Sequence, residues 1–294
     1  MPRTRREPAG RYRKDEARPP RPAAERIYEF GEETMLLLNE NLPGYAKGDF
    51  TNYILFKFME EKWQQDYFLD GKMYMQAPSN FHDPKMGEGR SDIFEGSDLV
   101  VWPNKDKYAS IKWGEKDGQS YFVVEEHKEK PVDYIENTFF AYSSVENKSR
   151  NVFCMYALWF DYSKKCISEI NDKMLKDFGE YGVVITNRSE FYNRIGLAVN
   201  KSEFIKEAKC GFVEYIPIEE RDSVIDWNPF LKMDQGYDFQ HEFRISFVKT
   251  YEGLLEFDLN CSLRDIALPV KTQDVIEGIR FKDEYLYIPT MDKL

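Results

Sequence analysis

The segment from residue 238 to 247, DFQHEFRISF, combines the residue types and the spacing that chemistry needs. In an extended strand, side chains two positions apart share a face, so Gln240, Glu242 and Arg244 should point the same way as Ser246. The intervening residues are mostly apolar and should face a core. One interpretation of the polar face is a solvated surface on which Glu242 and Arg244 form a local ion pair. The other is a catalytic site.

A carboxylate and an amide two residues apart on one strand face suit the cleavage of a glycosidic bond. When the bond between nicotinamide and ribose in NAD breaks, positive charge develops on the ribose ring. A carboxylate beside the ring stabilises that oxocarbenium-like transition state. The amide can orient the attacking nucleophile. In this interpretation Glu242 is the catalytic carboxylate and Gln240 is its partner.

From about residue 53 to 289 the chain resembles a large bacterial family known only as a domain of unknown function. The family has a Leu-Tyr-Lys-Tyr-like strand, a Phe-Asn-Asp-Pro loop, a middle strand ending in Ser, a Glu/Gln-x-Glu-aromatic-Arg segment and a closing Val-Ile-x-Gly. The matching segments are LFKF at 55–58, PSNFHDP at 78–84, FAYS at 140–143, QHEFR at 240–244 and VIEG at 275–278. The chain departs from the family pattern at Phe56, where Tyr is usual, and at His82, where Asn is usual.

The order of these segments also resembles that of mono-ADP-ribosyltransferases of toxin and phage-defence systems. Those enzymes place a basic residue on an early strand, a Ser on a middle strand and Gln/Glu-x-Glu on a later one. The resemblance implies NAD as the substrate, with Glu242 and Gln240 catalytic, and Lys57 and Ser143 or Ser144 binding NAD. Lys57 departs from the Arg or His expected there, and Lys lacks the planar fork that Arg offers a phosphate.

In the site that this resemblance implies, Tyr74 or another aromatic residue would stack on nicotinamide, while Lys57 would meet the phosphates. The resemblance further implies a macromolecular acceptor, RNA or protein, and a toxin or phage-defence role in which an antitoxin or chaperone is the natural partner.

Two other functions fit parts of the sequence. Asp98 followed by Glu126-His127-Lys128 has the Asp…Glu-x-Lys order of Mg²⁺-dependent nucleases, in which two acids hold the metal and Lys helps to activate water. A non-enzymatic domain that recognises a ligand or partner is the other alternative. Its binding surface would be the long polar loop at 78–96, rich in Gly and Pro.

Composition bounds these functions. The net charge is −11 although residues 1–25 hold eight basic and four acidic side chains, so the body of the chain is acidic and unsuited to sequence-blind binding of nucleic acid. Four well-separated cysteines and three histidines give no zinc or disulfide pattern. No stretch is apolar enough to span a membrane, and the charged N-terminus is no secretory signal, so a cytoplasmic location is expected.

The expected architecture is a disordered Arg/Pro-rich tail at 1–24 and a single α+β domain at 25–294. The fold class expected is a split, mostly antiparallel β-sheet with a few peripheral helices, similar to ADP-ribosyltransferases, with strands 55–58 and 240–246 as the walls of an NAD cleft. Helices are predicted at 25–39, 60–71, 168–178 and 188–199. Strands are predicted at 51–59, 73–77, 99–102, 109–113, 121–125, 139–144, 152–160, 182–186, 210–216, 239–248, 254–259, 275–281 and 285–289.

Overall fold

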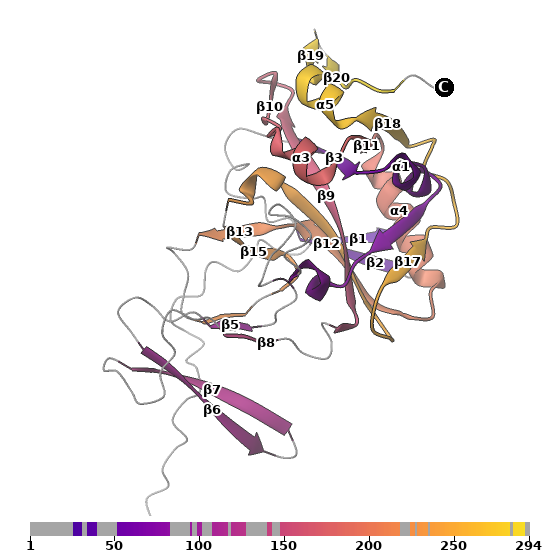
Figure 1. Ribbon diagram of the computed structural model, residues 1–294. Helices are drawn as coiled ribbons and strands as arrows, with labels where there is room; N and C mark the ends of the chain where they lie inside the picture. Colours follow the sequence, from indigo (N-terminus) through magenta and orange to yellow (C-terminus); the bar gives the residue numbers. More distant parts are fainter. Residues whose placement is uncertain are drawn as a thin grey trace, which may run out of the picture.

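A long apolar strand, β9 (Arg150–Asp161), forms the centre of the fold (Figure 1). Its sequence RNVFCMYALWFD is a nearly continuous apolar run, as expected of a strand buried on both faces. In this computed structural model the described residues are 26–30, 34–39, 52–82, 95, 99–101, 108–116, 119–127, 140–142, 148–217, 224–226, 228–234, 236–282 and 285–291. The tail predicted at 1–24 lies outside them.

Around β9 the described residues build a nine-stranded sheet in which the pairing is antiparallel except between β12 and β2. In spatial order its strands are β1 (Arg26–Phe30), β2 (Thr34–Asn39), β12 (Ile205–Phe212), β16 (Glu242–Lys249), β9, β3 (Asn52–Met59), β11 (Tyr181–Ile185) and β18 (Ala267–Lys271), with β10 (Cys166–Ile167) paired to β9. The α+β class with mostly antiparallel strands is therefore confirmed.

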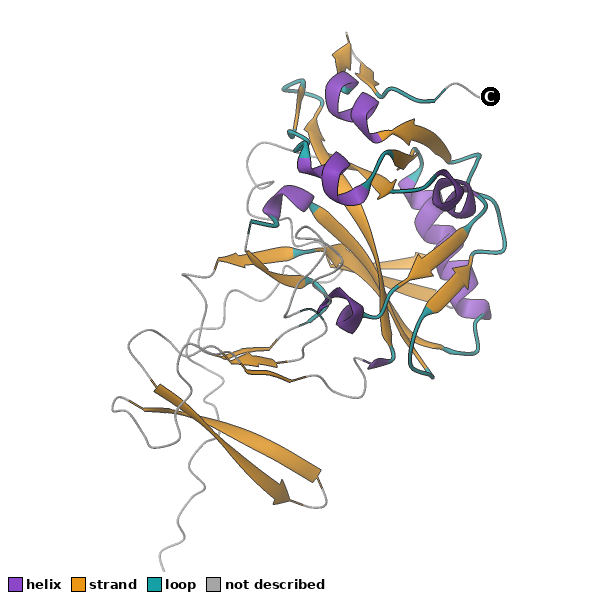
Figure 2. Ribbon diagram, in the orientation of Figure 1, coloured by secondary structure: helices purple, strands orange, loops and turns teal. Residues whose placement is uncertain are grey.

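Helices pack on both faces of this sheet (Figure 2). On one face, α1 (Lys62–Leu69) and α4 (Arg188–Lys201) bury side chains such as Phe68 and Phe191 against Leu55 of β3. On the other, α3 (Lys173–Phe178) and α5 (Thr272–Gly278) cover Phe56. The alternation of neighbouring β3 residues between two cores follows from the two-residue period of a strand.

Smaller sheets complete the described part of the chain. They pair β4 (Lys72–Met75) with β17 (Leu255–Asp258), β13 (Glu214–Pro217) with β15 (Leu231–Asp234), β6 (Tyr108–Lys116) with β7 (Gln119–His127) and β19 (Arg280–Lys282) with β20 (Tyr285–Tyr287), and they place β5 (Leu99–Val101) between β14 (Val224–Asp226) and β8 (Phe140–Tyr142). The described helices include none with the length and apolarity needed to cross a bilayer.

Local signals in the sequence predicted many of these elements. The helix expected at 60–71 is α1; Gln64 Oε1 accepts a hydrogen bond from the backbone of Glu61 at its start, and Gly71, at φ +86°, follows its end. The helix at 188–199 is α4, whose first turn is capped by the Asn187 side chain. Most of the predicted strands coincide with observed ones.

Three predictions are wrong. In place of the helix predicted at 25–39, residues 26–30 and 34–39 form the antiparallel pair β1 and β2, because the apolar run MLLL finds a parallel strand partner in β12. Residues 275–278 belong to helix α5, where Val275 packs into the core and Thr272 Oγ1 donates to the Gly179 carbonyl. The helix expected at 168–178 begins only at Lys173.

Candidate functional site

A pocket opens where β3 and β9 separate. The two strands pair from Asn52 opposite Phe160 to Phe56 opposite Tyr156, and their pairing ends there although both strands continue. On its other edge β9 keeps its pairing with β16 as far as Arg150. The resulting gap is the floor of a cavity of about 470 Å³, which α1, β4 and β16 also line.

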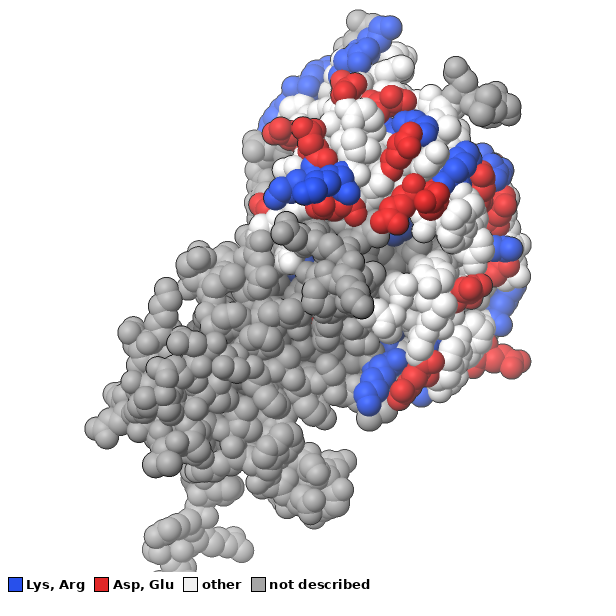
Figure 3. Space-filling model, viewed as in Figure 1, with Lys and Arg blue, Asp and Glu red and all other residues white. Residues whose placement is uncertain are grey.

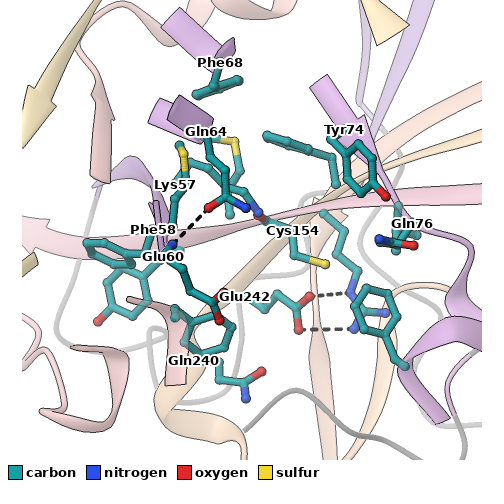
Figure 4. Close-up of a pocket in the computed structure, with 18 of the residues that line it drawn as sticks. Lys57, Phe58, Glu60, Gln64, Phe68, Tyr74, Gln76, Cys154, Gln240 and Glu242 are labelled. Atoms are coloured by element: carbon teal, nitrogen blue, oxygen red, sulfur yellow. Dashed lines mark hydrogen bonds and ion pairs between the residues drawn. The ribbon is translucent and has the colours of Figure 1, made fainter. Parts of the chain in front are cut away.

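Lys57 lies in this gap. Its Nζ donates a hydrogen bond to the backbone carbonyl of Cys154 at 2.8 Å, and it sits 4.5 Å from the centre of the Phe153 ring. Cys154 belongs to the part of β9 that β3 no longer pairs, so a side-chain donor takes the place of a strand neighbour. The expected phosphate-binding lysine therefore lines the pocket and also closes the open edge of β9 (Figure 4).

The polar face of β16 is buried, so the interpretation of this face as a solvated surface is wrong. Glu242 is 5% exposed and Arg244 is 1% exposed. The two side chains pair as predicted: Arg244 Nε donates to Glu242 Oε1 at 2.7 Å, and Nη2 donates to Oε2 at 3.2 Å. Both residues line the pocket, so this ion pair lies at the bottom of a cavity and not in bulk solvent.

Gln240 reaches the pocket from a position that the strand pattern did not predict. It ends a short 3-10 helix, η3 (Asp238–Gln240), and β16 begins only at Glu242. Between them His241 adopts the left-handed conformation, at φ +38°, so Gln240 and Glu242 are not alternate residues of one strand. They are nevertheless brought together, because Lys232 Nζ lies 2.9 Å from Gln240 Oε1 and 3.6 Å from Glu242 Oε2.

A second acidic residue completes the polar end of the pocket. Glu95 is 2% exposed, and its two carboxylate oxygens accept hydrogen bonds from Arg244 Nη1 at 2.6 Å and Nη2 at 2.7 Å. Two carboxylates, from Glu95 and Glu242, thus face two cations, from Arg244 and Lys232. Buried charges are tolerated when they are paired in this way.

The ionisation states follow from this pairing. Burial alone would raise the pKa of Glu242, but the charges of Arg244 and Lys232 outweigh it and lower the pKa to about 2, so the carboxylate is ionised at neutral pH. Burial, together with the nearby Glu242 charge, raises the pKa of the Cys154 thiol, which stays protonated. Burial lowers the pKa of His241 to about 4, so its ring is neutral and contacts the Tyr156 hydroxyl at 3.2 Å.

Aromatic side chains surround the other end of the pocket. Trp63 on α1 is 63% exposed, and the ring of Tyr67, one turn later, meets it edge-on with centroids 6.4 Å apart. Tyr74 on β4 is 48% exposed and lines the same cavity. The ammonium of Lys72 lies 5.5 Å from the centre of the Tyr67 ring. This end offers flat rings with a positive charge beside them.

The pocket is therefore lined by four of the residues that the sequence predicted for an NAD site: Lys57, Tyr74, Gln240 and Glu242. The strands expected as walls, β3 and β16, both contribute, but they flank β9 within one sheet. Glu95, Lys232 and Trp63 were missed; Trp63 alone had a local signal, as an aromatic residue beside Tyr67 on α1. Other predicted residues lie outside the described part of the chain or have only their backbone described: Ser143, Ser144, Asp98, Lys128 and, on β7, Glu126.

The known proteins offer no guide to this pocket. Comparisons of the chain with protein-family models, with curated proteins and with solved structures found no match.

Proposed function

We propose that the pocket binds NAD, that Glu242 promotes cleavage of the nicotinamide–ribose bond, and that ADP-ribose passes to a macromolecular acceptor, RNA or protein. One observation carries the proposal. Lys57, Tyr74, Gln240 and Glu242, which an ADP-ribosyltransferase-like site would require, line one cavity although they come from separate segments of the chain. The sheet also opens between β3 and β9, as a split sheet would require.

Glu242 has the charge that the reaction needs. When the bond from ribose C1′ to the nicotinamide nitrogen breaks, nicotinamide leaves with the bonding electrons and the ribose becomes cationic. An ionised carboxylate held in a buried, preorganised position stabilises that cation. The oxygen of water or of an acceptor then bonds to C1′ and releases its proton. Gln240, fixed by Lys232, would orient this nucleophile.

The cavity also suits a small-molecule ligand in size and lining. A volume of about 470 Å³ falls within the usual range for small-molecule sites, which combine mostly apolar walls with a few polar groups. The aromatic end would hold a planar ring, with Tyr74 against nicotinamide, and Lys57, which lines the same cavity, would meet a phosphate. On the face in Figure 3 the described acidic and basic side chains are interspersed.

A direct test measures nicotinamide release from NAD by the purified chain. We expect release by the wild type and a loss on the order of 10²–10³-fold in Glu242→Gln, because one preorganised charge is removed. The matched control is Lys249→Met, which also removes a buried charge from β16 but at a position outside the pocket. It should keep its activity per folded molecule. Absence of release by the wild type, or full activity of Glu242→Gln, would contradict the proposal.

The acceptor is identified with labelled NAD in a cell extract. Label that becomes bound to macromolecules and is then released by ribonuclease assigns RNA as the acceptor, and release by protease assigns protein. A toxin or phage-defence role would appear as growth arrest on expression of the wild type but not of Glu242→Gln. Label that stays soluble as ADP-ribose would show that the enzyme hydrolyses NAD and does not transfer ADP-ribose.

A recognition domain without turnover is the second candidate, and the pairing in the pocket favours it. Glu95, Glu242, Arg244 and Lys232 balance one another, as a purely structural or ligand-binding cluster would. Calorimetry separates the two functions. Tight binding of NAD without any release of nicotinamide would assign the pocket to recognition alone.

A further inference from the structure

Glu95 forms a bidentate ion pair with Arg244 at the polar end of the pocket. Its carboxylate accepts from both terminal nitrogens of Arg244, at 2.6 and 2.7 Å, in the bidentate geometry that gives the strongest arginine–carboxylate pairs. The two residues are 149 positions apart in the chain, and both side chains are almost fully buried. Glu95 also lines the cavity itself.

Arg244 transmits this contact to Glu242. The guanidinium uses its outer edge for Glu95 and the edge that carries Nε for Glu242, and Nη1 also donates to the Pro229 carbonyl at 2.8 Å. Because the guanidinium is planar, fixing the outer edge fixes the direction of the inner one. The orientation of the Glu242 carboxylate in the cavity therefore depends on Glu95.

Glu95 also contributes to the charge that a ligand meets at the polar end of the pocket. Arg244 lies between two carboxylates, so its positive charge is shared. Without the negative charge of Glu95, the cluster of Glu242, Arg244 and Lys232 would carry a net positive charge. A ribosyl cation forming beside it would then be repelled, and in a buried site this repulsion is strong.

We propose that Glu95 is a positioning residue of this site: acting through Arg244, it orients the Glu242 carboxylate and offsets the arginine charge, so that the pocket favours a cationic sugar ring. The inference rests on the proposed function for its kinetic consequence. Its electrostatic part, a preference for a cationic over a neutral ribose-like ring, is a property of binding and is tested without turnover.

The experiment compares wild type, Glu95→Gln, Glu95→Asp and Lys249→Met. The binding probes are a protonated iminoribitol, which mimics the ribosyl cation, and the isosteric neutral anhydroribitol, both titrated by calorimetry. We expect the wild type to bind the cation more tightly than the neutral probe. In Glu95→Gln the ratio of the two affinities should be about tenfold smaller. In nicotinamide release, kcat of Glu95→Gln should fall 10–100-fold with KM nearly unchanged, since misplacing one catalytic group costs about that much. Glu95→Asp, which keeps the charge, should recover part of both effects.

A merely structural Glu95 gives a different pattern. Glu95→Gln would then behave as Lys249→Met, losing stability while keeping both kcat per folded molecule and the preference for the cation, and that pattern would overturn the inference. So would a wild type that binds both probes equally, even if it releases nicotinamide. A wild type that prefers the cation through Glu95 but releases no nicotinamide would instead refute the proposed function and leave the electrostatic role of Glu95 standing.

Discussion

The Lys57 ammonium lies 2.8 Å from the carbonyl oxygen of Cys154, at the point where β3 leaves β9. Replacing Lys57 by Met should remove that donor and leave a strand carbonyl facing the gap. An unsatisfied buried carbonyl costs about 1–3 kcal/mol, so we expect a decrease of that size in the free energy of unfolding, measured in urea. Lys57→Arg should largely retain stability. An unchanged stability of Lys57→Met would show that another donor reaches the carbonyl.

Glu242 should be important for stability as well as for activity. Breaking one partner of a buried ion pair commonly costs about 3–5 kcal/mol. Glu242→Gln keeps an acceptor for Arg244, and Glu95 still pairs with the guanidinium, so we expect a loss of about 3 kcal/mol. The control is Glu203→Gln, at an exposed position, which should change stability by less than about 0.5 kcal/mol. Equal stability of the two variants would mean that the ion pair is not maintained in solution.

Local sequence patterns could predict the elements around the pocket, because their signals are local. The apolar run of β9 and the glycine after α1 act over a few residues. The edge pair β1 and β2 was missed for the opposite reason. Besides β1, the backbone partner of β2 is β12, which lies far along the chain and which no local pattern reveals.

The residues of the site can also be divided into those with a local sequence signal and those without one. Glu242 and Arg244 are two residues apart, so the sequence alone suggested their ion pair. Glu95 meets Arg244 across 149 residues, and a lone glutamate within the polar sequence 78–96 has no pattern to single it out. The sequence also could not predict that the polar face of β16 is buried. A polar face of β16 looks the same whether it meets water or a paired set of charges, and only the tertiary fold decides between them.

Acid should destabilise the fold in two steps. Between pH 6.5 and about 4, unfolded chains protonate His241 whereas the buried ring does not, so stability falls as pH decreases through this range. Between pH 4.5 and about 2, the unfolded state protonates Glu242 while the paired carboxylate stays ionised, and stability falls again. Urea titrations at several pH values would measure both steps. His241→Asn, which tolerates the positive φ, should reduce the first step, and Glu242→Gln should reduce the second. The second step should persist in part, because ion pairs and hydrogen bonds also lower the pKa values of Asp66, Asp161, Glu190 and Asp265. A profile identical to that of the wild type in either variant would refute the assignment.

The aromatic end of the pocket should govern affinity and not chemistry. Trp63 is 63% exposed, so Trp63→Ala should leave the unfolding free energy nearly unchanged. If its ring stacks on a base of NAD, KM should rise several-fold while kcat stays constant, because the contact is equal in ground and transition states. Tyr285→Ala, at a 77% exposed position outside the pocket, is the control and should change neither constant. An unaltered KM in Trp63→Ala would show that the Trp63 ring does not contact NAD.

Removal of divalent metal distinguishes the transferase from the nuclease. Hydrolysis of a phosphodiester through Asp98, Glu126 and Lys128 would use Mg²⁺ to activate water and to stabilise the leaving oxygen. Departure of nicotinamide needs neither, because the leaving group is already a cationic ring nitrogen that becomes neutral as the bond breaks. We therefore expect release of nicotinamide from NAD to persist in excess EDTA. Transfer of label from NAD to macromolecules should persist there as well. The control is Glu126→Gln, which should leave both activities unaltered. Cleavage of DNA or RNA that proceeds without NAD, stops in EDTA and is lost in Glu126→Gln would assign the catalytic function to Asp98, Glu126 and Lys128. The pocket between β3 and β9 would then have a binding role.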